Sequence, residues 1–426
     1  MPDGGSTAHL YEPKLVAVLR EGYRGRDLRA DIAAGLTVAV VALPLSMAIA
    51  VASGVSPERG LYAAIVGGLI VSALGGSRVQ IGGPAGAFIV LVAGVAAKLG
   101  LQGLLAAVLM SGLMLMLLGL ARVGTLVRHI PHAVTVSFTC AIAVTIAAGQ
   151  LKDFAGLHLA GPEPGDFVPK LAAIGEALGS LNLAALALGA AVVTVVALMR
   201  RLRPGWPGML LAVVLASLCA VALHLPVETI GSRFGGIPGG LPGPALPPLR
   251  LVTDLNVLSA AAAFTLLGAV ESLLSAKVAD SMTRRRHRSN MELIAQGLAN
   301  IGSALIGGIC VTGTIARTAT NVRAGARSPV SGMLHSVFLL LFMIVAAPLA
   351  AYVPLAALAG VLLVVCWNMA EKVEFVRLLQ QWRPGAVALV TFAVTLARDL
   401  TAGIVAGCLL AAIFALLRRP IAAEGE

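Results

Sequence analysis

Charged and aromatic residues are scarce in this 426-residue chain, at 12% and 4% of its length. Hydrophobic residues make up 58% of it, and the mean hydropathy is +0.93. A soluble globular domain usually has about 25% charged residues, so this chain has too few of them to cover a water-exposed surface of its size. Because a helix of about 20 apolar residues crosses a bilayer, the composition indicates a polytopic membrane protein.

Motifs of enzymes and of nucleotide hydrolysis are also missing. The sequence contains no His-Glu-x-x-His, no Gly-x-Ser-x-Gly and no Gly-x-x-x-x-Gly-Lys. Its five cysteines lie in apolar segments and form no Cys-x-x-Cys pair, which favours buried thiols over disulfides or a metal site. We therefore expect no enzyme activity, no cofactor and no metal, and transport would have to be driven by an ion or substrate gradient.

The apolar runs predict an all-α protein with fourteen transmembrane segments. Twelve runs lie near 31–52, 58–75, 101–120, 132–149, 182–199, 206–223, 256–280, 289–308, 329–351, 353–368, 384–397 and 400–417. Two further segments, near 82–96 and 310–324, are too short to span, and each follows a glycine-rich break. They are third in each half, and such interrupted segments at matching positions indicate a transporter's substrate site.

Two sets of seven segments predict two inverted repeats, since an odd number reverses the second set. The expected organisation is a cytoplasmic N-terminal leader (1–30), a first repeat (31–223), an extracytoplasmic Pro/Gly-rich connection (224–255), a second repeat (256–419) and a C-terminal tail (420–426). The expected half-helices are segments 3 and 10.

The net charge of +11 supports this topology. With both termini inside, 21 Lys and Arg residues fall in cytoplasmic loops and 7 in outside loops, as the positive-inside rule requires. No basic run is interleaved with aromatic residues, so we expect no nucleic-acid partner.

Few ionisable residues fall within the predicted spans, where a charge costs about 2.5–3.5 kcal/mol on insertion scales. Glu271 lies mid-span, with Ser275 one turn further on the same side. We expect Glu271 to carry a proton during transport, the alternative being a permanent pair with a base or a helix end.

Arg317 follows Thr312 and Thr314 in the second short segment. Two half-helices meeting head to head would favour an anion there, and Arg317 would add a fixed charge. The alternative is an arginine that only neutralises Glu271 or caps a helix.

These residues resemble the sulfate permease (SulP) family of anion transporters over about residues 25–419. The motifs that carry the resemblance are Gly75-Gly76-Ser77-Arg78 leading into Gly83-Pro84-Ala85, Gly268-Ala269-Val270-Glu271-Ser272-Leu273-Leu274, and Ile315-Ala316-Arg317 with Asn321-Val322-Arg323-Ala324-Gly325. The resemblance implies a core (segments 1–4 and 8–11) that moves against a gate (5–7 and 12–14), and a homodimer.

The resemblance also implies the residues of the site. Substrate contacts would come from Phe88, Thr314, Ala316, Arg317, Leu45 and Ile49, with Glu271 and Ser275 in proton coupling. Many members carry Gln and Tyr where Leu45 and Ile49 stand, and this departure disfavours a polar contact from the first segment. Most members continue into a STAS-type regulatory domain, which we expect to be absent here or cut away, because the sequence stops soon after Arg419.

Leu43-Pro44-Leu45, Ala316-Arg317 and Trp367-Asn368-Met369 look most like the bacterial branch that takes up C4-dicarboxylates with protons. We therefore expect a secondary active transporter of the inner membrane, carrying an anion such as fumarate or succinate by alternating access. Bicarbonate or sulfate transport and a passive anion channel remain open, and a nucleobase permease of the same fold is disfavoured.

Overall fold

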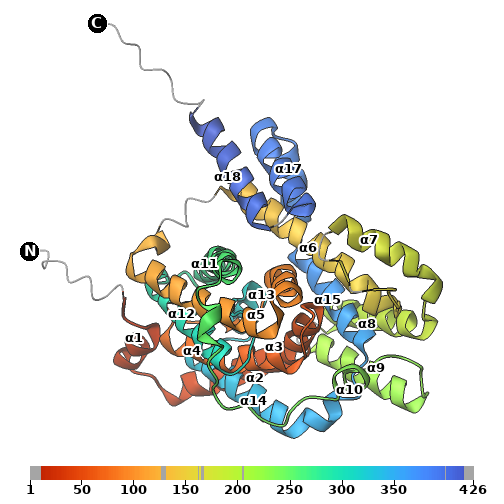
Figure 1. The fold of residues 1–426 in the computed structure, drawn as a ribbon. Coiled ribbons are helices and arrows are strands. Elements are labelled where there is room, and N and C mark those ends of the chain that lie inside the picture. The colour runs from red at the N-terminus through yellow and green to blue at the C-terminus, as the bar shows by residue number, and fades with distance from the viewer. Residues whose placement is uncertain are drawn as a thin grey trace, which may run out of the picture.

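The computed structural model describes residues 11–125, 131–161, 163–164, 167–203, 206–398 and 400–416, and this part of the chain is mostly helical (Figure 1). The first ten residues of the expected leader and the expected tail, 420–426, lie outside the described residues.

The elements follow the predicted apolar runs in order. Those of the first half are α1 (Lys14–Glu21), α2 (Gly25–Ala52), α3 (Glu58–Tyr62), η2 (Ala63–Gly67), α4 (Gly68–Leu74), β1 (Gly82–Gly83), η3 (Gly86–Phe88), α5 (Ile89–Leu120), η4 (Val123–Thr125), α6 (His132–Ala155), α7 (Phe167–Glu176), η6 (Ala177–Ser180), α8 (Leu183–Leu202) and α9 (Gly208–Ala222). Those of the second half are α10 (Ile230–Phe234), η7 (Leu249–Leu251), α11 (Leu255–Thr283), α12 (Ser289–Leu305), β2 (Thr312–Gly313), α13 (Ile315–Arg323), α14 (Val330–Ala350), α15 (Leu355–Met369), α16 (Lys372–Leu379), α17 (Trp382–Ala397) and α18 (Leu400–Leu416).

The N-terminal leader is more structured than its polar sequence suggests. It contains α1, and α2 begins at Gly25, six residues before the expected start of the first segment. The carboxylate of Asp27 accepts a hydrogen bond from the Arg24 backbone N–H at 3.2 Å, which extends the helix by capping its first turn.

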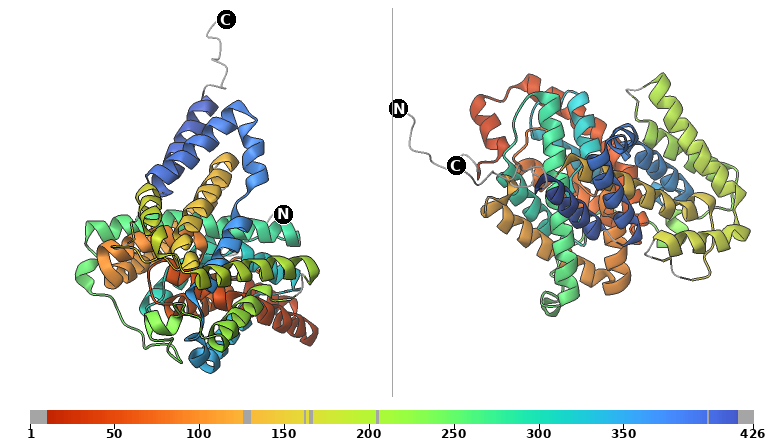
Figure 2. Two further views of the ribbon diagram at one scale, coloured as in Figure 1. Left: turned by 90° about the vertical axis from the view of Figure 1, so that its right-hand side faces the viewer. Right: turned by 90° about the horizontal axis from the view of Figure 1, so that it is seen from above.

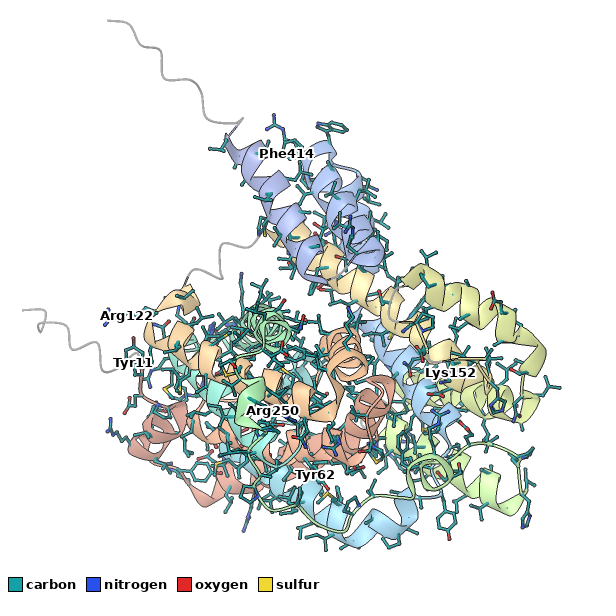
Figure 3. The ribbon with its side chains drawn as sticks, in the orientation of Figure 1. Tyr11, Tyr62, Arg122, Lys152, Arg250 and Phe414 are labelled. Atoms are coloured by element: carbon teal, nitrogen blue, oxygen red, sulfur yellow. The ribbon has the colours of Figure 1, made fainter. Side chains whose placement is uncertain are left out.

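The segment containing α1 is bound to the ends of several helices. The Lys14 N–H donates to the Gly75 carbonyl at 3.0 Å, and Arg288 forms an ion pair with Glu12 at 3.2 Å. Tyr11 lies beside Arg122 past the end of α5 (Figure 3), where Arg122 Nε donates to the Tyr11 hydroxyl at 3.3 Å. The leader therefore packs against the end of α4, the end of α5 and the start of α12.

The third and fourth predicted segments are joined in α5. Gly100 interrupts this helix with a φ of 67°, a left-handed conformation that glycine adopts without steric cost. The break separates a short stretch, starting at Gly86, from a longer one that ends at Leu120.

The helices form two groups. We call α2, α4, α5, α11, α12, α13 and α14 the first bundle, and α6, α8, α9, α15, α17 and α18 the second bundle, because contacts are most extensive within each set. The bundles meet mainly where α2 packs against α15 and α9. Helices α17 and α18 project from the rest of the molecule (Figures 1 and 2).

Among the described residues, six helical stretches are long and apolar enough to cross a membrane alone: α2, Gly86–Leu120, α6, α8, α11 and α14. Helices α15 and α16, which are bent by 41° at their junction, would together form a seventh. The shorter apolar helices α9, α17 and α18 fall below this length, so the count of fourteen segments stays a prediction.

A long connection joins the two halves of the chain and contacts both bundles. The Ile230 N–H donates to the Val353 carbonyl at 2.9 Å, and Arg233 pairs with Asp153 of α6 at 2.9 Å. Further along, the Ala245 N–H donates to the Leu305 carbonyl at the end of α12, at 2.7 Å. Residues 236–244 between these anchors are rich in glycine and proline and run as an extended loop (Figure 1).

Candidate functional site

The two glycine-rich breaks meet in a two-stranded antiparallel sheet. Gly82 pairs with Gly313, and Gly83 pairs with Thr312. The Ile81 carbonyl also accepts hydrogen bonds from the Thr314 N–H at 2.9 Å and the Thr314 hydroxyl at 3.0 Å. Because a helix starts just after each strand, the antiparallel pairing brings the N-termini of η3/α5 and of α13 to one place.

Neither helix N-terminus is capped by a side chain. The residues at the N-cap positions, Ala85 and Thr314, accept no hydrogen bond from the first turn through their side chains. The first N–H groups of a helix have no intrahelical partner and carry partial positive charge. The meeting point therefore offers N–H donors and a positive potential to an anion.

Arg317 lies in the first turn of α13 and is 1% exposed. Its Nη2 donates to the Ser46 hydroxyl of α2 at 3.1 Å and to the Pro84 carbonyl at 3.3 Å. Its Nε and Nη1 have no hydrogen-bond partner, and no carboxylate of the described chain pairs with it. A buried charge is costly unless it is paired, so this arginine has unsatisfied capacity for an anion.

Glu271 lies half-buried in the middle of α11 and forms no ion pair or hydrogen bond within the described part of the chain. The alternative in which it pairs permanently with Arg317 therefore does not hold in this structure. Ser275, one turn further along, is fully buried, and its hydroxyl lies 3.3 Å from that of Thr318 in α13. Glu271 is thus on the side of α11 that packs against the second half-helix.

The remaining residues of the expected site are mostly apolar and buried. Phe88 is 1% exposed and packs against Phe264 of α11, with ring centroids 6.0 Å apart. Leu45 and Ile49 are buried in α2, one turn apart and on either side of Ser46 in the sequence. Ala316, in contrast, is exposed at the start of α13.

The meeting point faces the second bundle. A methyl group added at Gly86 would lie 3.6 Å from Ile146 Cδ1 of α6 and 4.0 Å from Met369 Sδ of α15. The half-helix N-terminus of the first bundle is therefore next to side chains of the second bundle, where relative movement of the bundles would change its surroundings.

Sequence reasoning missed Ser46 and the Pro84 carbonyl as partners of Arg317. Ser46 is the one polar residue in the apolar stretch 38–52, and it is fully buried. That isolation is the signal that could have identified it. For metals, the described residues contain no group of three His, Cys, Asp or Glu side chains that could hold an ion.

Comparison with known proteins identifies the family. The model of the sulfate permease family matches residues 28–395. The chain belongs to the sulfate permease family. Membership makes it a multi-pass membrane protein of a family of anion transporters, and supports a transport function over an enzymatic one.

Relatives within the sulfate permease family are named for different anions. The putative sulfate transporter YvdB of Bacillus subtilis (strain 168) is 42% identical over 93% of this chain and 75% of its own length. The bicarbonate transporter BicA of Picosynechococcus sp. is 33% identical, and the match covers 79% of this chain and 61% of the relative.

A solved structure shares the fold. It is the transmembrane domain of a cyanobacterium bicarbonate transporter BicA, which matches with a TM-score of 0.82 and 30% identity, over 90% of this chain and 98% of that one. The helical arrangement is therefore that of a sulfate permease transmembrane domain.

Proposed function

We propose that this protein is a secondary active anion transporter of the bacterial inner membrane that takes up C4-dicarboxylates with protons. The observation that carries the proposal is the buried Arg317 guanidinium, which has two nitrogens without partners beside two uncapped helix N-termini. Such an arrangement favours a bound anion over an empty site, because the anion would satisfy the donors and neutralise the charge.

The charges at the site suit a doubly charged anion when Glu271 is protonated. Each helix N-terminus is equivalent to roughly +0.5 of a charge, so the two termini and Arg317 together offer roughly +2. An ionised Glu271 would lower this to roughly +1, which suits a singly charged anion. Protonation of Glu271 would therefore favour a dicarboxylate dianion, and its deprotonation would favour release.

Alternating access would come from movement of the first bundle against the second. We propose fourteen segments in two inverted repeats, with half-helices at segments 3 and 10 and both termini in the cytoplasm. Helices α15 and α9, which pack against α2, are composed mostly of small and apolar residues, so sliding there would break few hydrogen bonds.

Bicarbonate or sulfate transport is the second candidate, and it is favoured by the names of the two relatives above. The apolar residues Leu45 and Ile49 fit the carbon chain of a dicarboxylate better than the fully polar surface of sulfate. A passive anion channel is the third candidate, and it differs in that it cannot concentrate its substrate.

The deciding experiment is uptake by the purified protein in liposomes, using labelled fumarate, succinate, bicarbonate and sulfate, with and without an inward proton gradient. We expect gradient-driven accumulation of the dicarboxylates. Accumulation of sulfate or bicarbonate alone would overturn the dicarboxylate assignment, and uptake that never exceeds equilibrium would indicate a channel.

Two variants test the residue roles. Because a hydrogen bond to a charged group contributes about 1.5–3 kcal/mol, Arg317→Ala should raise KM by roughly 10- to 150-fold. Arg323→Ala, an exposed arginine at the other end of α13, is the matched control. Glu271→Gln should remove the dependence of uptake on pH, whereas Glu176→Gln, at an exposed position, should not.

A further inference from the structure

A chain of buried polar groups connects α11 and α12 to both half-helices. Its members Ser272, Gln296, Asn300 and Thr312 are all fully buried. None of them is among the predicted site residues, although Ser272 follows Glu271 directly and Thr312 lies in the second short segment.

The Asn300 side chain of α12 pairs with both the N–H and the carbonyl of the residue before β2, as a residue of a neighbouring β-strand would. Its Oδ1 accepts a hydrogen bond from the Val311 N–H at 2.9 Å, and its Nδ2 donates to the Val311 carbonyl at 2.9 Å. Gln296, one turn earlier, also donates to the Val311 carbonyl. Because this backbone is not helical, it needs partners from side chains, and α12 supplies them.

Ser272 extends this network to α11. Its hydroxyl donates to Gln296 Oε1 at 3.0 Å, lies 2.9 Å from the Thr312 hydroxyl, and accepts from the Gly313 N–H at 3.1 Å. Its backbone carbonyl accepts from Gln80 Nε2 at 3.0 Å, in the segment leading into β1. Ser272 therefore contacts the segments that precede both half-helices. Its hydroxyl contacts β2, before α13, and its carbonyl contacts Gln80, before β1 and η3.

Ser272 is also the residue next to Glu271 in the chain. A shift or rotation of α11 around Glu271 would move the Ser272 hydroxyl, and with it the start of the second half-helix. We propose that Ser272, together with Gln296 and Asn300, is a positioning clamp that couples the protonation of Glu271 to the geometry of the anion site. This inference rests on the proposed function and adds to it how the proton site and the anion site are connected.

The surroundings of Glu271 leave few other routes for a pH effect. In the described chain, the elements with the most extensive contacts to α11 carry these charged or titratable groups: Arg317 and Arg323 on α13, Glu292 on α12, Lys98 on α5 and Cys408 on α18, while α11 itself adds Lys277 and Asp280. None of them forms an ion pair with Glu271, so a direct salt bridge does not supply the coupling.

The test measures the KM of dicarboxylate uptake in liposomes at pH 6 and pH 8. Coupled sites typically change each other's affinity by about 5- to 150-fold, and we expect a ratio in this range for the wild-type protein. In Ser272→Ala the ratio should fall to less than about twofold, although Glu271 and Arg317 are intact. Ser281→Ala, the same change at an exposed position of α11, should retain the wild-type ratio.

Thr312→Val provides a second variant in case Ser272→Ala does not fold. It conserves shape while it removes the hydroxyl that contacts Ser272, and we expect it to lower the ratio in the same direction. A wild-type ratio in Ser272→Ala or in Thr312→Val overturns the clamp and leaves the proposed function standing. A wild-type protein whose KM does not depend on pH overturns the proton coupling itself, and the clamp with it.

Discussion

The Arg317 guanidinium packs directly against the backbone of Gly83, so that a side chain of the second half-helix touches the strand that leads into the first. An added Cβ atom at Gly83 would overlap Arg317 Nη1. This nitrogen is one of the two that have no hydrogen-bond partner. The absence of a side chain at position 83 is therefore required for the position of the charge.

Gly83→Ala should displace the guanidinium and weaken anion binding. We expect KM for uptake to rise by at least roughly tenfold, the lower end of the range for losing a charge-assisted hydrogen bond. Gly94→Ala is the matched control, because a methyl group at that position in α5 meets no atom within 4 Å. An unchanged KM in Gly83→Ala, with a folded protein, would show that the guanidinium position does not determine binding.

Asp31 of α2 is the anchor of the turn between α13 and α14. Its fully buried carboxylate accepts hydrogen bonds from the Arg327 N–H at 2.7 Å, the Ser328 N–H at 3.2 Å, the Ser328 hydroxyl and the Tyr23 hydroxyl. In Asp31→Asn, an NH2 group, which donates hydrogen bonds, would replace one carboxylate oxygen, which accepts them. This NH2 group would face the N–H and hydroxyl donors that the carboxylate binds. We expect it to lower the free energy of unfolding by about 1.5–3 kcal/mol.

Thermal unfolding in detergent measures this loss, and Asp27→Asn is its control. Asp27 pairs with Arg327 at 2.8 Å on the surface, where ion pairs contribute little. We therefore expect Asp27→Asn to have a much smaller effect. Equal losses in the two variants would contradict the idea that burial makes Asp31 the anchor.

The helices of this protein could be predicted well from its sequence, because apolar runs in a chain with so little charge have to be buried or to face lipid. The breaks before Gly86 and Ile315 could also be predicted, from glycine and proline. Helices α7 and α16 were missed, since they are short and partly polar. The leader helix α1 was missed for the same reason, although Val18 within it is buried.

The partners within the site could not be predicted in the same way. The sequence indicates that Arg317 and Glu271 lie in spans, but not whether they pair, because a side chain on a helix can face any of several neighbours. The register of β1 against β2 and the contact of Arg317 with Ser46 depend on how distant segments pack. An isolated polar residue in an apolar run, such as Ser46, was the available signal for these contacts.

Glu21 provides a test that separates surface charge from the proposed proton site. A hydrogen bond from Arg78 lowers the pKa of Glu21 below its ordinary value. A lowered pKa means that this pair stabilises the folded state above the ordinary pKa, and that the contribution is lost only as the pH falls through the lowered value. Glu21 therefore stays ionised between pH 6 and pH 8.

Glu21→Gln should leave the ratio of uptake rates at pH 6 and pH 8 as it is in the wild-type protein. Glu271→Gln, measured in the same liposomes, should bring this ratio close to one. If Glu21→Gln removed the pH dependence instead, the proton-sensitive group would lie at the α1 end of the bundle and not beside the anion site.

The connection between the two halves gives a prediction about movement. It is bound to the second bundle through Arg233 and Asp153, and to the end of α12 in the first bundle through Ala245 and Leu305. Residues 236–244 make no hydrogen bond with the rest of the described chain. Their extended length therefore limits how far one bundle can travel from the other on this side of the molecule.

Deleting residues 236–240 should slow transport without weakening binding. An extended chain spans about 3.3–3.6 Å per residue, so the deletion removes roughly 16–18 Å of reach. We expect Vmax to fall while KM stays unchanged, because the loop is far from the anion site in sequence and contributes none of the predicted site residues. Replacing the same five residues by serine keeps the length and should retain Vmax. If Vmax also fell in the serine variant, the loop would act through its side chains or its stiffness. If Vmax were unchanged in the deletion, the two bundles would move less than the length of the loop allows.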